Sequence, residues 1–161
     1  MKGKRGWEPR ELRLCSEYIR TFHWKARCLT RVRLGKYPSE LLKYVEAGEE
    51  VRLLTVWRRW ADAIAIYPDR IILIECAIRP NVGKIAQLKL YKMLFYQTPE
   101  FEHLKHLPLE LELVYAIEDP ATLELCKDEG IRPVYFKPAW VESYINLLFP
   151  YERRGSIQEI K

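Results

Sequence analysis

Two acidic residues, Asp62 and Glu75, flank a turn signal and are placed to share one chemical site. The residues between them are rich in isoleucine and alanine and are interrupted at Pro68-Asp69, a pattern typical of a β-hairpin. A turn centred there puts Tyr67 opposite Arg70. Paired residues then have numbers that sum to 137, so Asp62 falls opposite Glu75. The spacing therefore predicts two carboxylates about 5 Å apart on one face of a sheet.

This pair of carboxylates needs something to relieve its repulsion, because like charges directly opposite each other destabilise a sheet. A shared proton, a nearby Lys or Arg, or a divalent cation would do so. Ligands that offer only oxygen favour Mg²⁺ or Mn²⁺ over zinc. The alternative is a slip in strand register, which would separate the two side chains and remove the site.

A helix predicted over residues 82–97 adds further polar side chains. Lys84, Gln87 and Tyr91 follow an i, i+3, i+7 spacing and share one helix face. Because this helix directly follows the Glu75 strand, the face can lie beside the carboxylates. An ordinary solvated helix face is the alternative interpretation of the same spacing.

The elements that must position these residues follow from hydrophobic periodicity and turn residues. Helices are predicted at 9–22, 37–48, 82–97, 119–130 and 138–148, and strands at 24–34, 51–67, 70–78, 109–117 and 133–136. The early strands should form an antiparallel meander, and the later strands should be joined through helical crossovers. We therefore expect an α/β fold, a three-layer sandwich with a mixed central sheet.

The strand predicted at 24–34 has one basic face. Alternation directs Trp24, Ala26, Cys28, Val32 and Leu34 to one side and Lys25, Arg27, Arg31 and Arg33 to the other. Such charges either protect an edge strand from aggregation or bind nucleic acid. With Arg58 and Arg59, they could hold a phosphate backbone without reading bases.

Charge and composition narrow the classes of protein. Residues 1–60 carry a net charge of +8, residues 61–107 carry +1 and residues 108–161 carry −4, which suggests a polyanionic partner. At 161 residues, with 48% hydrophobic and 30% charged residues, one globular domain is expected at 1–150, followed by a mobile tail at 151–161. No apolar run is long enough to span a membrane, and no C-x-x-C pair points to zinc. We expect an intracellular, cytoplasmic protein, either cellular or encoded by a virus.

The chain resembles the PD-(D/E)XK nuclease superfamily, whose fold is shared by many restriction enzymes and repair nucleases. The resemblance lies in Trp60-Ala61-Asp62 and in the strand 72–77 around Glu75. Gln87-Leu88-Lys89-Leu90-Tyr91 is similar to the Q-x-x-x-Y element of the RecB-like branch. The likeness covers about residues 8–148 and implies a restriction-endonuclease-like fold.

The family pattern implies a metal site built mainly from carboxylates. Asp62 and Glu75 would be ligands for Mg²⁺ or Mn²⁺, and the backbone carbonyl of Cys76 would supply a further oxygen. Many members add an acid from the first helix. Glu11 is our candidate for that acid, with Glu8 as the alternative.

One departure from the family pattern concerns a lysine two residues after the glutamate, where this chain has Ala77. In the family this lysine helps to orient the attacking water and stabilises charge on the phosphate. Lys84 could replace it from the following helix, and Arg79 is a second candidate. Gln87 and Tyr91 would position the substrate or support the ligands.

The resemblance implies a metal-dependent nuclease that hydrolyses phosphodiester bonds, with DNA as the expected substrate and RNA left open. Ala77 favours an alternative, an inactive nuclease-fold module that binds nucleic acid or has a structural role. A third hypothesis is a regulatory or assembly protein whose basic strand faces a protein partner. Small nucleases of this type often form homodimers or belong to larger assemblies.

Overall fold

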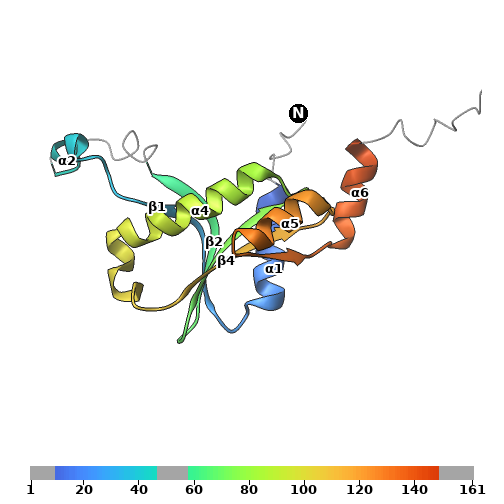
Figure 1. Ribbon diagram of the computed structural model, residues 1–161, viewed down its shortest axis with the longest axis horizontal. Coiled ribbons are helices and arrows are strands. Elements are labelled where there is room, and N and C mark those ends of the chain that lie inside the picture. Colours follow the sequence, from blue (N-terminus) through green and yellow to red (C-terminus); the bar gives the residue numbers. More distant parts are fainter. Residues whose placement is uncertain (1–9, 47–57, 149–161) are drawn as a thin grey trace, which may run out of the picture.

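The computed structural model describes residues 10–46 and 58–148 (Figure 1). Its elements, in chain order, are α1 (Arg10–Phe22), β1 (Arg27–Leu34), α2 (Ser39–Glu46), β2 (Arg59–Ile66), β3 (Ile71–Ala77), α4 (Val82–Gln97), the 3-10 helix η2 (Pro99–Leu104), β4 (Leu109–Tyr115), α5 (Pro120–Asp128), β5 (Ile131–Tyr135) and α6 (Ala139–Leu148). Each predicted helix and strand has a counterpart, and η2 is the one element among residues 10–46 and 58–148 that was not predicted. The first residues of the strand predicted at 51–67 and the tail at 151–161 lie outside the described residues.

Five strands form one mixed sheet in the order β1-β2-β3-β4-β5. The first three strands are antiparallel, while β3, β4 and β5 run parallel to one another. A short turn joins β2 to β3, and a longer segment that includes α2 joins β1 to β2. Each parallel pair is joined by a helical crossover, through α4 and η2 and then through α5. The predicted meander followed by crossovers is confirmed.

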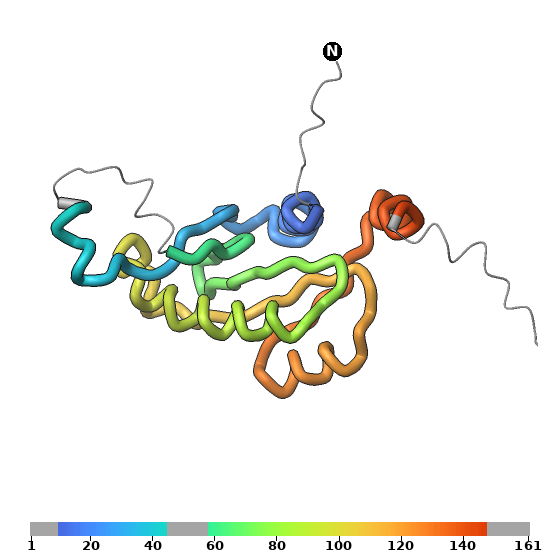
Figure 2. The backbone as a smooth tube through the Cα atoms, turned by 90° about the horizontal axis from the view of Figure 1, so that it is seen from above, coloured from blue at the N-terminus to red at the C-terminus, as the bar shows by residue number. Residues whose placement is uncertain are grey.

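Helices cover both faces of the sheet and make the molecule a three-layer α/β structure (Figure 2). On one face, α4 and α5 bury apolar residues of the strands, among them Ile64, Ile71 and Leu73. On the other face, α1 and α6 cover a second core that includes Ile72 and Ile74. The alternation of these five residues between the two cores follows the period of two of a β-strand.

Strand β3 lies at the centre of the sheet, and all seven of its residues are buried. Such a strand is covered on both faces, which explains its almost continuous run of apolar residues. Glu75 is the single ionisable carboxyl in this run. The fold therefore holds one carboxylate in a position where a hydrophobic residue would be expected.

The alternation predicted for the first strand is wrong, because Arg31 interrupts the pleat. Arg31 has a φ of 51°, in the left-handed region. Leu29 and Val32 both pack against the core on the α4 side, although a regular strand would direct them to opposite faces. Trp24, expected among the inward-facing residues, lies before β1 and is 71% exposed. The basic side chains of this segment therefore do not share one continuous face.

Candidate active site

The hairpin of β2 and β3 has the predicted register. Ala63 pairs with Ile74, and the pairs that follow keep the same sum of residue numbers. The backbone N–H of Asp62 donates a hydrogen bond of 3.0 Å to Glu75 Oε1. The backbone N–H of Cys76 donates one of 2.9 Å to Asp62 Oδ2. Asp62 and Glu75 are therefore neighbours, as the turn position predicted, and backbone donors orient both carboxylates.

Lys84 approaches this pair from the first turn of α4. The helix begins after Asn81, whose side-chain oxygen accepts a hydrogen bond from the Lys84 N–H, as an N-cap residue does. A lysine at this end of a helix is disfavoured by the helix dipole. The carboxylates compensate, since Lys84 Nζ lies 3.0 Å from Glu75 Oε2 and 3.8 Å from Asp62 Oδ2. The predicted proximity of Lys84 to the pair is confirmed.

A third carboxylate reaches the same ammonium from the other layer. Glu11, in the first turn of α1, has its Oε2 atom 3.5 Å from Lys84 Nζ. The alternative acid, Glu8, lies outside the described residues. We call the four residues Glu11, Asp62, Glu75 and Lys84 the carboxylate–lysine cluster. Its members come from α1, β2, β3 and α4, so both helical layers contribute to it.

The carboxylate–lysine cluster has an excess of negative charge, because three carboxylates face one ammonium. Glu75 is only 2% exposed, and burial is the main reason why its pKa rises to about 7, with the charge of Asp62 as the second cause. Burial alone would lower the pKa of Lys84, but the three carboxylates outweigh it and raise that pKa. Lys84 is therefore charged at neutral pH, while Glu75 readily takes up a proton.

This arrangement bears on whether the cluster could hold a divalent cation. Within residues 10–46 and 58–148, no group of three or more His, Cys, Asp or Glu residues is arranged as a ready-made metal site. The donor chemistry nevertheless suits Mg²⁺ or Mn²⁺, because all three acidic side chains offer oxygen and lie within 3.8 Å of one cationic atom. With all four groups ionised the cluster carries a charge of −2, which one divalent ion would neutralise.

Two other residues expected on this face of α4 differ in their environments. Tyr91 is buried in the core beneath the helix. Burial first and then the charge of Glu75 raise its pKa, and the charges of Lys84 and Asp62 also act on it, so Tyr91 lies near the cluster, as expected. Gln87 is exposed, and its side chain makes no hydrogen bond within the described part of the chain. A helix turns by about 100° per residue, so Gln87 is rotated about 60° from Lys84, away from the core side. Among the described residues no hydrogen bond joins Gln87 to the cluster, so its expected place at the site stays a prediction.

Arg79, the second candidate for the missing lysine, is also directed elsewhere. Strand β3 ends at Ala77, two residues before it, so the strand does not carry Arg79 on the face of Glu75. Its side chain is 73% exposed and its guanidinium lies 3.3 Å from Asp119. Lys84 is therefore the cation that the fold brings to the carboxylates, and Arg79 is not.

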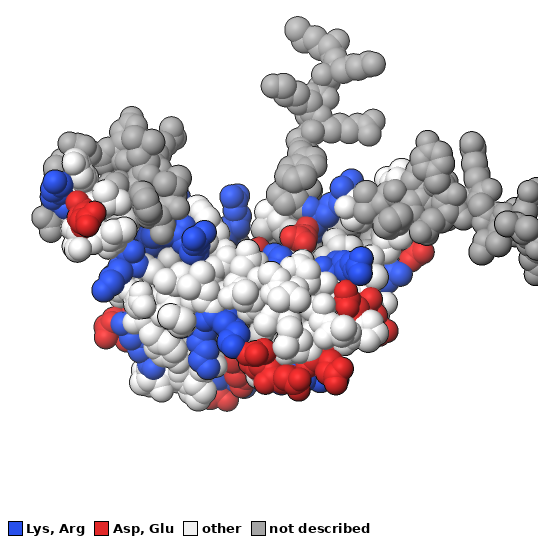
Figure 3. Space-filling view, turned by 45° about the horizontal axis from the view of Figure 1, so that its top comes forward, with Lys and Arg blue, Asp and Glu red and all other residues white. Residues whose placement is uncertain are grey.

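The six cations expected to bind nucleic acid differ in their environments. Lys25, Arg27, Arg31 and Arg59 are exposed and Arg33 is half-buried. Arg58 was wrongly assigned to this group, because its side chain is only 10% exposed and lies 2.8 Å from Glu100, a residue of the unpredicted helix η2. Figure 3 shows basic side chains spread over one face of the molecule and acidic ones gathered along one edge.

A pocket of about 340 Å³ lies against the cluster and was not predicted. We call it the Trp60 pocket, and its lining residues are Glu11, Leu12, Arg31, Trp60, Ala61 and Asp62. Two of them, Glu11 and Asp62, also belong to the carboxylate–lysine cluster. The indole of Trp60 is 43% exposed, with the guanidiniums of Arg33 and Arg31 at 4.4 and 5.4 Å from its ring centre.

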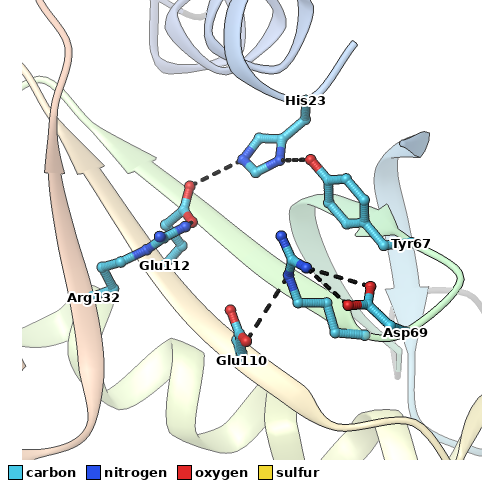
Figure 4. A network of polar contacts seen from close by, with 7 residues as sticks. His23, Tyr67, Asp69, Glu110, Glu112 and Arg132 are labelled. Atoms are coloured by element: carbon cyan, nitrogen blue, oxygen red, sulfur yellow. Dashed lines mark hydrogen bonds and ion pairs between the residues drawn. The ribbon is translucent and has the colours of Figure 1, made fainter. Parts of the chain in front are cut away.

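A second polar network lies on the α1 side of the sheet (Figure 4). Glu112, on β4, is fully buried and accepts hydrogen bonds from the Tyr18 hydroxyl and the Arg132 guanidinium. His23 Nε2 lies 3.2 Å from the same carboxylate, and its Nδ1 lies 2.7 Å from the Tyr67 hydroxyl. Burial alone would raise the pKa of Glu112, but these hydrogen bonds lower it below its usual range. The polar groups of this network hydrogen-bond to one another, which is the arrangement expected of a structural role.

Comparison with known proteins leaves the function open. No family model and no curated protein matches the chain. One solved structure that resembles it is the crystal structure of a protein of unknown function, AF1548, with a TM-score of 0.46 and 9% sequence identity. The alignment covers 78% of this chain and 57% of that protein. Among the described residues, no helix has the length and apolar character needed to cross a membrane.

Proposed function

We propose that this protein is a metal-dependent nuclease with a restriction-endonuclease-like fold, which hydrolyses phosphodiester bonds in DNA with Mg²⁺ or Mn²⁺. The observation that carries the proposal is the convergence of three carboxylates and one lysine from four separate elements. A chain optimised only for stability would not gather three acids around a single ammonium, because like charges brought together are destabilising. Such clusters of groups with displaced pKa values are typical of functional sites.

The residues of the cluster have distinct roles in this proposal. Glu11, Asp62 and Glu75 would hold the metal ion, with the Cys76 carbonyl as a further ligand. Backbone N–H groups fix Asp62 and Glu75, so two of the acids are preorganised. The chemistry that Mg²⁺ or Mn²⁺ supplies in such a site is polarisation of the phosphate and a lower pKa for water.

Lys84 would take the role of the lysine that Ala77 replaces. Its side chain is 15% exposed, and its ammonium stays charged because the surrounding carboxylates raise its pKa. A fixed positive charge at this point would stabilise the negative charge that develops on the phosphate in the transition state. The exposed cations Lys25, Arg27 and Arg59 would attract the nucleic acid backbone from further away.

One observation favours a second function, an inactive module of the same fold that binds nucleic acid. Lys84 already offsets part of the charge of Asp62 and Glu75 without a metal ion. A protein that had lost catalysis could keep this ion pair for stability alone. Binding through the basic side chains would then remain, and cleavage would be absent.

A cleavage assay separates the two functions. The full chain should be incubated with supercoiled plasmid, single-stranded DNA and RNA in Mg²⁺, in Mn²⁺ and in EDTA. The proposal predicts cleavage with a divalent metal, none in EDTA, and none by Asp62→Ala. Lys84→Ala should be slower by about 10²- to 10³-fold, the usual cost of removing one electrostatic contact to the transition state.

Lys89→Ala provides the matched control for Lys84→Ala. Lys89 is a lysine of the same helix, but it pairs with Glu129 on the surface, outside the cluster. This variant should cleave at the wild-type rate. If the wild-type protein binds DNA but cleaves nothing with any metal, the inactive module is the correct function.

A further inference from the structure

We propose that the Trp60 pocket binds an unpaired nucleobase, so that the ligand of this protein is single-stranded nucleic acid. The inference deepens the proposed function, on which it rests for the choice of a nucleic acid as ligand. It concerns a binding subsite beside the cluster, defined by an aromatic ring and two arginines. Its test depends on binding and does not require cleavage.

The position of Trp60 is the first step of the argument. Trp60 lies near the start of β2, two residues before Asp62, and its indole is 43% exposed. It lines a pocket whose other wall is formed by Glu11 and Leu12 at the start of α1. An exposed large aromatic ring beside a charged pocket offers a surface on which a flat ring can stack, and base–aromatic stacking is the usual means of binding unpaired bases.

The two arginines at this ring are the second step. Arg33 is the cross-strand partner of Trp60 in the β1–β2 ladder, and Arg31 reaches the same ring from a backbone position in the left-handed region. This conformation is energetically unfavourable for a residue other than glycine, and such strain is concentrated at functional sites. Neither guanidinium has a carboxylate partner among the described residues. Both therefore remain available to stack on a base or to bind a phosphate.

The size of the pocket favours a single nucleotide. A volume of about 340 Å³ is near the lower end for small-molecule sites, which begin at about 300 Å³. In a duplex both faces of each base are already stacked, so a base could enter only after unpairing, at a cost of a few kcal/mol. A single strand avoids this cost. The pocket therefore favours single strands over duplexes.

The closeness of the pocket to the carboxylates links base binding to the proposed chemistry. Glu11 and Asp62 line the pocket and also contact Lys84. A nucleotide whose base stacks on Trp60 would thus have its neighbouring phosphate beside the carboxylate–lysine cluster. Stacking at this position would hold the strand in place for hydrolysis, which is a common use of binding energy next to a reacting group.

Fluorescence anisotropy can test the subsite. The full chain would be titrated into labelled dT12 and into a labelled 12-base-pair duplex, in EDTA so that no cleavage occurs. Wild-type protein should bind dT12 more tightly than the duplex. Trp60→Ala should weaken binding of dT12 by about 5- to 150-fold, the range for loss of one stacked base, and should change duplex binding little.

Two further variants control for folding and for the loss of an exposed aromatic ring. Trp60→Phe keeps an aromatic ring and should retain most of the affinity for dT12, with an unchanged circular dichroism spectrum. Trp24→Ala removes another exposed tryptophan, which lies under Lys25 but outside the Trp60 pocket, and should bind dT12 like the wild type.

The possible outcomes distinguish this inference from the proposed function. Equal binding of dT12 by wild type and Trp60→Ala would overturn the subsite, even if the protein cleaves DNA. An equal loss for dT12 and duplex would also overturn it, because the ring would then serve duplex binding. Binding of dT12 that depends on Trp60, in a protein that cleaves nothing, would support the subsite and refute the nuclease.

Discussion

Replacing Glu75 by glutamine should stabilise the protein at alkaline pH, although Glu75 lies in the candidate active site. The carboxylate is 2% exposed and has Asp62 beside it. Burial first, and then the charge of Asp62, raise its pKa to about 7 from an ordinary value of 4.5. Glutamine has no charge to desolvate, and its oxygen can still accept the Asp62 N–H. The substitution therefore removes the cost of ionisation and keeps one hydrogen bond.

The magnitude follows from the two pKa values of Glu75. Below pH 4.5 the carboxyl is protonated in both the folded and the unfolded chain. As the pH rises from 4.5 to 7, the unfolded chain loses the proton first, so the folded state loses stability. At about 1.36 kcal/mol for each pH unit between the two values, the total loss above pH 7 is about 3 kcal/mol.

Urea unfolding in EDTA at pH 4.5 and pH 8 measures this effect. The stability of Glu75→Gln relative to wild type should be about 3 kcal/mol more favourable at pH 8 than at pH 4.5. Comparing the two pH values cancels the constant effects of the substitution itself. Glu110→Gln, which changes a carboxylate that is 51% exposed on β4, should show a much smaller dependence on pH.

A difference between wild type and Glu75→Gln that does not change with pH would refute the reasoning. In that case the ion pair with Lys84, 3.0 Å away, would compensate fully for the burial of the carboxylate. The cluster would then be a satisfied structural ion pair, and its excess negative charge would no longer indicate a cation site. The cleavage assay would remain as a separate test of the nuclease.

Other predictions concern metal binding, the second network and the backbone. Mg²⁺ at 100 times its dissociation constant should raise the free energy of unfolding of the wild type by about 2.7 kcal/mol and should not do so for Asp62→Ala, as urea titrations can check. Glu112→Gln should lower the free energy of unfolding at pH 7 by about 1.5–3 kcal/mol, because the buried Tyr18 and His23 lose their charged acceptor. The pKa of Glu112 is lowered in the folded chain, so this stabilisation is present above about pH 4.5, and the deficit of the variant should shrink as the pH falls below that value. Gly35→Ala should lower the thermal midpoint through a loss of about 1–2 kcal/mol, since Gly35 has a φ of 96° and the added Cβ would lie 3.3 Å from Leu94. Binding of DNA should weaken steeply with salt, in proportion to the number of phosphates contacted, and a salt titration of the dissociation constant checks this.

The fold could be predicted from the sequence because its signals are local. Pro68-Asp69 fixes the turn of the β2–β3 hairpin, and the apolar runs on both sides fix the faces. The same register places Asp62 beside Glu75. The Asn81 cap places Lys84 in the first turn of α4, and its approach to the carboxylates was predicted because this helix directly follows the Glu75 strand. These features need only short stretches of chain.

Features that depend on distant neighbours could not be predicted. Arg58 pairs with Glu100, which lies 42 residues further along the chain in a helix without a clear signal. The Trp60 pocket depends on the position of α1 and on the left-handed backbone of Arg31, neither of which has a local marker. The i, i+3 spacing could not decide whether Gln87 contacts the cluster, because it describes neighbours on a helix and does not say how the helix is rotated against the sheet.

Two buried carboxylates on neighbouring strands differ in how far the chain compensates their charge. Glu112 is paired in register with Ile74, next to Glu75, but it faces the opposite layer. The fold surrounds Glu112 with hydrogen-bond donors that lower its pKa, whereas Glu75 shares one lysine with two other acids and its pKa is raised. Hydrogen-bond donors of the chain compensate the charge of Glu112 on the neighbouring strand, so this sheet can hold a fully compensated carboxylate. In our proposal a cation from outside the chain supplies the compensation that Glu75 lacks within the fold, and the metal titration tests this proposal directly.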